Sequence, residues 1–213
     1  MTVHEPIILF TDLLLAAVAG WLAWRLRRGL ATDNRAAWWW ANALGFIALA
    51  AVVGGLYHAH AANPFALIPR FSAPLDWSWW IVTLLLTCSV SLAMDFSLLH
   101  LAFPAGLRPA WRAAVVVKFT AFGIAAIIHP YFWVAITSYG LSLIAWTVAA
   151  LLRRGPWSGW MLAGIGLSLA AALVQLKRSG IFAHLEDNDL YHLIQAIALY
   201  GFYRAGRLFA PKA

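Results

Sequence analysis

The chain has 213 residues, of which 63% are hydrophobic and only 11% are charged, and its formal net charge is +7. A water-soluble domain of this size could not bury so much apolar surface, so the composition excludes a soluble fold. The Lys and Arg residues stand in pairs at the ends of apolar segments, which is typical of membrane topology signals and not of a nucleic-acid-binding surface. We therefore expect membrane lipids, and no nucleic acid, around this chain.

The apolar segments predict an all-α fold, an integral membrane bundle of seven transmembrane helices. Each helix needs about 20 apolar residues to cross the hydrocarbon core, so seven spans with their connections use up the length. We expect residues 1–213 to form a single seven-helix transmembrane domain. The expected spans are 7–27, 38–60, 79–101, 111–129, 131–152, 157–176 and 189–209. Tryptophans at the span ends, such as Trp38, Trp39 and Trp40, are expected to anchor the helices at the lipid headgroups.

The distribution of Lys and Arg predicts the orientation. The connections after the first, third and fifth spans and the C-terminal tail hold eleven of the 15 residues, the opposite side holds three, and Lys118 lies within a span. Positive charge marks the cytoplasmic side, so we expect the N-terminus outside and the C-terminus in the cytoplasm of a multi-pass protein of a bacterial inner membrane. Because acidic residues precede the first apolar stretch and arginines follow it, the first span is expected to be a retained helix and not a signal peptide.

Two acidic residues belong to the first span. Glu5 precedes it, and Asp12 lies about 10 Å deeper at ~1.5 Å per residue. An intramembrane carboxylate is a functional candidate by default, so we expect Asp12 and Glu5 to be catalytic. The alternative for Asp12 is a pairing with a polar group on a neighbouring helix that has no chemical role.

The second span ends in Gly54-Gly55-Leu56-Tyr57-His58-Ala59-His60. The two glycines, one turn before His58, allow another backbone to approach closely, and His58 can then point into a tight space between helices. The alternative is a His that bonds a backbone carbonyl at the helix end, and this applies still more to His60.

The seventh span opens with Asp189-Leu190-Tyr191-His192-Leu193-Ile194-Gln195. Its polar groups stand at i, i+3 and i+6, so they form one stripe on which Asp189 and His192 are neighbours. Such a stripe should face the bundle or a water-filled cavity, because lipid would leave it unsatisfied. The alternative for Asp189 is a helix N-cap.

Elsewhere, Asp95 and Lys118 both fall in the cytoplasmic half of their spans by residue count. We expect them to pair and neutralise each other in the low-dielectric interior. The alternatives are a proton relay or a second polar site.

If the helices close into a ring, the first, second and seventh are neighbours and bring two imidazoles and two carboxylates together. Imidazole and carboxylate are suitable zinc ligands, and three protein ligands with one water generate a hydroxide-like nucleophile near neutral pH. We expect His58, His192 and Asp189 as metal ligands, with an additional carboxylate as general base.

The helix number, the outside N-terminus, a His late in the second helix and a His early in the seventh resemble the superfamily of alkaline ceramidases and adiponectin receptors. The resemblance implies a membrane hydrolase whose zinc is bound by one second-helix His and two His of an H-x-x-x-H motif on the seventh, which here makes His58 and His192 ligands. The chain departs from that pattern, because Ala196 and Asn188 stand four residues after and before His192, and Gly54 stands where a Ser is expected. The third ligand would then be Asp189, Asp12 or another side chain.

The Glu5-Pro6, Gly-Gly-x-x-His and Asp-x-x-His-x-x-Gln stretches also resemble an uncharacterised bacterial seven-helix membrane family. The leading hypothesis is a zinc-dependent intramembrane hydrolase acting on a lipid amide or ester. One alternative is a b-type haem protein with two axial histidines from among His58, His60, His129 and His192. Another is a non-enzymatic receptor or transporter that binds protons or a polar solute.

Overall fold

The computed structural model describes residues 6–31, 33–60, 74–177 and 187–209. Within these ranges the chain is all-α, as expected, and has no strand. The helices are α1 (Pro6–Arg28), α2 (Arg35–His60), α3 (Pro74–Ala102), the short 3-10 helix η1 (Ala105–Leu107), α4 (Arg108–Ile128), α5 (Phe132–Arg153), α6 (Ser158–Lys177) and α7 (Asp187–Arg207). The predicted spans match these helices within a few residues. The largest difference is at α3, which begins at Pro74, because proline suits the first turn of a helix.

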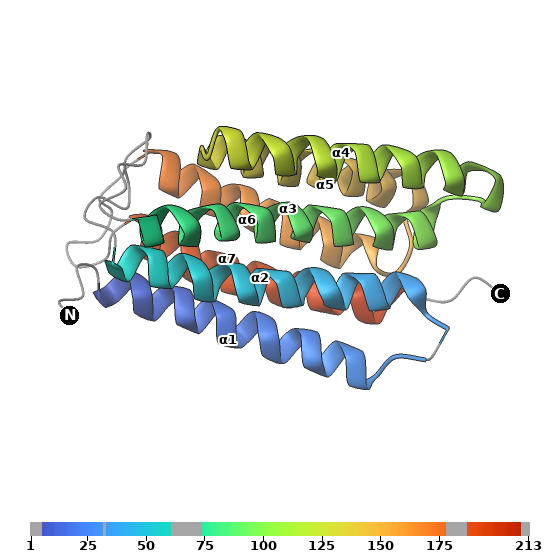
Figure 1. Ribbon diagram of the computed structural model, residues 1–213. Helices are drawn as coiled ribbons and strands as arrows, with labels where there is room; N and C mark the ends of the chain where they lie inside the picture. Colours follow the sequence, from blue (N-terminus) through green and yellow to red (C-terminus); the bar gives the residue numbers. More distant parts are fainter. Residues whose placement is uncertain (1–5, 32, 61–73, 178–186, 210–213) are drawn as a thin grey trace.

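The helices lie side by side along one direction (Figure 1). In chain order α1 packs on α2, α2 on α3, and α3 on both α4 and α5, while α5 packs on α6 and α6 on α7. The last helix, α7, also packs against α1 and α2, which closes the bundle. The expected neighbourhood of the first, second and seventh helices is therefore confirmed.

Six helices, α1 to α6, are long and apolar enough to cross a membrane. Their outer faces expose large apolar side chains, for example Val117 at 66%, Ile144 at 63% and Leu152 at 78%. Such a surface is unfavourable in water and is satisfied by lipid. The helix α7 is less apolar because it carries Asp189, His192 and Gln195, and all three side chains are buried inside the bundle.

An aromatic cluster joins α2 and α5 to the C-terminal end of α7. Trp40 contacts Trp146 with ring centroids 4.7 Å apart, and Trp146 stacks on Phe209 at 5.4 Å. The indole nitrogen of Trp40 donates to the carbonyl of Phe202 at 2.8 Å. Trp40 is only 2% exposed, so its expected place at the headgroups is wrong, whereas Trp38 at 47% exposure agrees with it.

Two glycines allow α6 and α7 to approach closely. A Cβ atom on Gly201 would lie 3.2 Å from the Cα atom of Gly164. A Cβ atom on Gly164 would lie 2.6 Å from the ring of Phe202. Gly164 of α6 therefore serves a helix contact inside the chain.

Candidate functional site

A buried carboxylate and imidazole from the two ends of the chain meet between α1 and α7. The Nε2 atom of His192 lies 3.2 Å from Oδ1 of Asp12. The residues are 7% and 4% exposed. The second carboxylate oxygen of Asp12, Oδ2, is buried and has no hydrogen-bond partner in the described part of the chain. Asp12 therefore keeps one acceptor in an apolar surrounding, where an unmade hydrogen bond is costly.

Thr11 joins this pair to Asp189, a contact that the sequence analysis did not predict. Its hydroxyl donates to Oδ1 of Asp189 at 3.0 Å and lies 3.3 Å from Nδ1 of His192. The hydroxyl is also 3.1 Å from the carbonyl of Ile8, a bond that any helical Thr can make. Because a lone Thr in an apolar helix usually bonds only its own backbone, its sequence position carried no signal.

The Thr11 hydroxyl has one hydrogen, so at a given time it donates either to Asp189 or to Nδ1 of His192. Nδ1 accepts from Thr11 in one arrangement and carries a hydrogen of its own in the other. On the other side of the ring, Nε2 of His192 faces Oδ1 of Asp12. The imidazole thus has a hydroxyl beside one nitrogen and a carboxylate beside the other, and a proton can move among these groups.

Gly55 explains how α2 comes so close to this pair. A Cβ atom at Gly55 would lie 2.9 Å from Cβ of Asp12, nearer than real side chains come. Gly54 faces the other way, where a Cβ atom would meet Thr83 of α3 at 3.5 Å. The Gly-Gly pair is therefore a place of close approach, but the group that approaches Gly55 is the Asp12 side chain and not the expected backbone of another helix.

The two histidines of α2 differ in their surroundings. His58 stands one turn after Gly55, the glycine that lies against Asp12, so both residues are on one face of α2. The ring of His58 also contacts Tyr57, with centroids 5.5 Å apart. The Nδ1 atom of His60 lies 2.7 Å from the carbonyl of Leu56. For His60 the structure thus shows the helix-end hydrogen bond given above as the alternative.

Asp189 lies inside the first turn of α7, which begins at Asp187. Its side chain is fully buried and accepts the Thr11 hydroxyl, so it joins the helices and is not the N-cap of α7. Tyr191, one residue before His192, interacts electrostatically with Asp12 and with Tyr139 of α5. The polar stripe of α7 therefore faces the bundle, as expected.

Of the five residues expected at the site, the structure brings Asp12, His192 and Asp189 into one network. His58 stands on α2 one turn after Gly55, against which Asp12 packs. Glu5 lies outside the described residues. The donor set of imidazoles and carboxylates suits zinc, and Oδ2 of Asp12 is an open acceptor. However, no group of three His, Cys, Asp or Glu side chains in the described ranges has the spacing to hold a metal ion. Both ring nitrogens of His192 have protein partners, so these residues as arranged do not form a three-ligand zinc site.

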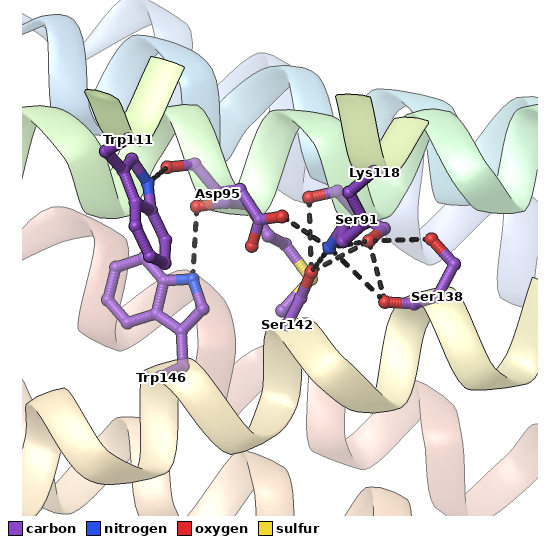
Figure 2. A network of polar contacts seen from close by, with 8 residues as sticks. Ser91, Asp95, Trp111, Lys118, Ser138, Ser142 and Trp146 are labelled. Carbon is purple, nitrogen blue, oxygen red and sulfur yellow. Dashed lines mark hydrogen bonds and ion pairs between the residues drawn. The ribbon is translucent and has the colours of Figure 1, made fainter. Parts of the chain in front are cut away.

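A second polar cluster lies between α3, α4 and α5 (Figure 2). The ammonium group of Lys118 forms an ion pair with Asp95, which confirms the expected pairing. The same group donates to the hydroxyls of Ser91 and Ser142, each at 2.8 Å. Ser138 donates to Ser91 at 3.1 Å. The charges are thus paired and bonded within the bundle, as a structural ion pair requires.

The chain matches, over residues 7–211, the family described as "Family of unknown function (DUF6962)". The chain belongs to this family, because the match covers nearly its whole length. No curated protein and no solved structure matches the chain.

Proposed function

We propose that this member of a family of unknown function is an intramembrane hydrolase that acts on a lipid amide or ester. The observation that carries the proposal is the contact of His192 with Asp12 at 3.2 Å, with Thr11 on the other ring nitrogen. An imidazole held between a carboxylate and a hydroxyl is an arrangement used for acid–base catalysis of acyl transfer. The resemblance to the ceramidase and adiponectin receptor superfamily supports the same reaction class and a lipid-like substrate.

In this proposal the pair moves one proton. His192 takes a proton from the attacking water or hydroxyl and returns it to the leaving amine or alcohol. Asp12 fixes the ring and offsets the positive charge that forms on it. Because the pair lies between α1 and α7 and is shielded from bulk solvent, the positive charge that forms on His192 interacts more strongly with Asp12 than it would in water.

Zinc belongs to the proposal as a separate, testable component. Bound at His58, His192 and Asp189, it would act as a Lewis acid and lower the pKa of a water molecule. Since the described side chains would have to rearrange for this, the proton-transfer role of Asp12 and His192 is proposed independently of the metal.

The topology proposed with this function has seven crossings, with the site at the outer surface of a bacterial inner membrane. The close packing of α7 on α1, α2 and α6 supports the seventh crossing. Arg27, Arg35 and Arg112 lie at the opposite end of the helices from His192, and this supports a cytoplasmic assignment of that end.

A second candidate is a receptor or transporter for a proton or a small polar solute. The burial of Asp12, Asp189 and His192, each at 7% exposure or less, favours it, because ionisable groups inside a membrane bundle often form proton or ion pathways. In that case Asp12→Asn changes proton movement across vesicles that contain the protein, and no substrate is cleaved.

The test uses the purified full chain in mixed micelles with a fluorescent long-chain acyl amide and the matching acyl ester. The wild type should release fatty acid from at least one of them, and Asp12→Asn and His192→Ala should not. The matched control is Asp33→Asn, which removes an exposed carboxylate between α1 and α2. If neither substrate is cleaved, with or without added zinc, the hydrolase proposal is wrong. Elemental analysis and an absorption spectrum of the same preparation test the zinc and haem b predictions.

A further inference from the structure

An open cavity of about 830 Å³ lies at the end of the bundle where α2 and α4 begin. Four helices contribute a basic side chain to its lining: Arg27 of α1, Arg35 of α2, His100 of α3 and Arg112 of α4. Among the described residues, no Asp or Glu lines it. Asp12 and His192 stand near the beginnings of α1 and α7, and Figure 1 shows these helix ends at the opposite end of the bundle from the start of α2, so the cavity is separate from the site described above.

The arginines of this cavity have no carboxylate partner in the part of the chain that the structure describes, where the ion pairs join Lys118 to Asp95 and His192 to Asp12. Arg27 instead donates to the amide oxygen of Asn42 and lies over the ring of Trp38, 5.9 Å from its centroid. Three guanidinium charges therefore line the cavity without an ion-pair partner among the described residues.

The backbone adds to this charge. Asn34 caps α2, because its side-chain oxygen accepts from the amide of Ala37 at 3.1 Å. The side-chain nitrogen of Asn34 donates to the carbonyl of Phe209 at 2.6 Å, which ties this helix start to the C-terminal end of α7. The N-terminus of α2, with its partial positive charge, is thus held at the cavity lining.

The remaining walls are aromatic. Trp39 stacks on Phe96 with ring centroids 4.7 Å apart, and Trp38 is half exposed beside them. A basic cavity with aromatic walls between transmembrane helices has the features that recognise a phosphate with apolar groups attached. Guanidinium groups bind phosphate oxygens in a bidentate manner, and Arg35 of α2 and Arg112 of α4 both line this cavity.

From these observations we infer that the cavity binds the phosphoryl group of an anionic phospholipid. Topology signals account for arginines at this end of the helices. They do not require that three arginines surround one cavity whose described lining contains no acidic side chain. The arginine next in sequence, Arg28, lies over Trp24 at 4.1 Å and does not line the cavity. The inference does not depend on the hydrolase proposal.

The test compares lipid retention by the full chain. Protein purified in detergent is mixed with equal amounts of phosphatidylglycerol and phosphatidylcholine, and bound lipid is counted by native mass spectrometry. We expect the wild type to retain phosphatidylglycerol in preference, and Arg35→Gln and Arg112→Gln each to weaken this by about tenfold or more, as loss of a charged hydrogen bond does. Arg28→Gln removes the same charge outside the cavity and should retain the wild-type preference.

Inorganic phosphate, added as a second probe, distinguishes the two sources of a phosphoryl group. Phosphate at millimolar concentration that displaces no phosphatidylglycerol supports a lipid site. If inorganic phosphate displaces phosphatidylglycerol from the wild type but not from Arg35→Gln, the lipid assignment is wrong and the cavity binds a soluble phosphate compound. Equal retention of the two lipids by the wild type would overturn the inference. So would an Arg28→Gln variant that loses the preference for phosphatidylglycerol as much as Arg35→Gln and Arg112→Gln do.

Discussion

Asp12 and His192 are 180 positions apart in the sequence, and their side chains meet at 3.2 Å between the first and last helices. The contact exists because α7 packs against both α1 and α2 and so closes the bundle. Both groups are buried, and each would be costly alone in an apolar interior. The pair therefore links the closure of the fold to the chemistry proposed for the site.

The first prediction concerns Asp12→Asn. The amide keeps the size of the side chain but cannot offset positive charge on His192, so hydrolysis of the acyl probe should fall by about 10²- to 10⁴-fold, the usual contribution of acid–base catalysis. Turnover per folded molecule is the measurement, with Asp33→Asn as control. Equal turnover of Asp12→Asn and the wild type would remove Asp12 from the mechanism.

The second prediction concerns Gly55→Ala. The new Cβ atom would lie 2.9 Å from Cβ of Asp12, so α1 and α2 must separate or Asp12 must turn away from His192. We expect a loss of about 1 to 3 kcal/mol in the free energy of unfolding, as in other overpacked sites, together with a loss of turnover.

The matched control is Gly45→Ala in the same helix, where no atom lies within 4 Å of the added carbon. It should be neutral or slightly stabilising, because Ala is the better helix former. Equal unfolding temperatures for the two variants would contradict the close approach at Gly55.

The architecture could be predicted from the sequence because the apolar stretches are long and the solvent is lipid. Helix bounds followed from the same pattern. The site was predicted through residues with strong chemistry, namely Asp12, His192 and Asp189, since a charged or titratable group within a span needs a partner.

What the sequence could not give was the identity of each partner. Thr11 and the serines around Lys118 are small hydroxyl residues that are common in membrane helices, so their composition carries no signal. The prediction for Trp40 was wrong because its partner in the bundle could not be identified from the sequence. Trp40 stands at a span end, where indoles usually meet headgroups, but Gly206 leaves room for its ring inside the bundle.

The third prediction concerns Gly206→Ala, which fills the space that the Trp40 ring occupies. A Cβ atom on Gly206 would lie 2.5 Å from Cδ1 of Trp40, a side chain that is 2% exposed and bonded to the carbonyl of Phe202. Gly206→Ala should therefore lower the unfolding temperature in detergent, whereas Gly166→Ala, with no atom within 4 Å, should not. An unchanged unfolding temperature for Gly206→Ala would mean that the Trp40 ring can adopt another conformation without loss of stability.

The fourth prediction concerns the ion pair between Asp95 and Lys118. Asp95→Asn leaves the ammonium group without its counter-charge next to Ser91 and Ser142, so the free energy of unfolding should fall by about 3 kcal/mol or more. Lys118→Met leaves a buried carboxylate and should cost a similar amount.

The double variant Asp95→Asn with Lys118→Met separates a structural pair from a functional one. If the pair is structural, removal of both charges should cost less than the sum of the single losses, because no uncompensated charge remains in the apolar interior. Denaturant unfolding in micelles gives the three values, and turnover of the acyl probe should be the same as in the wild type once the protein is folded. Additive losses would contradict the pairing, whereas a folded double variant without turnover would show that Lys118 and Asp95 take part in the function.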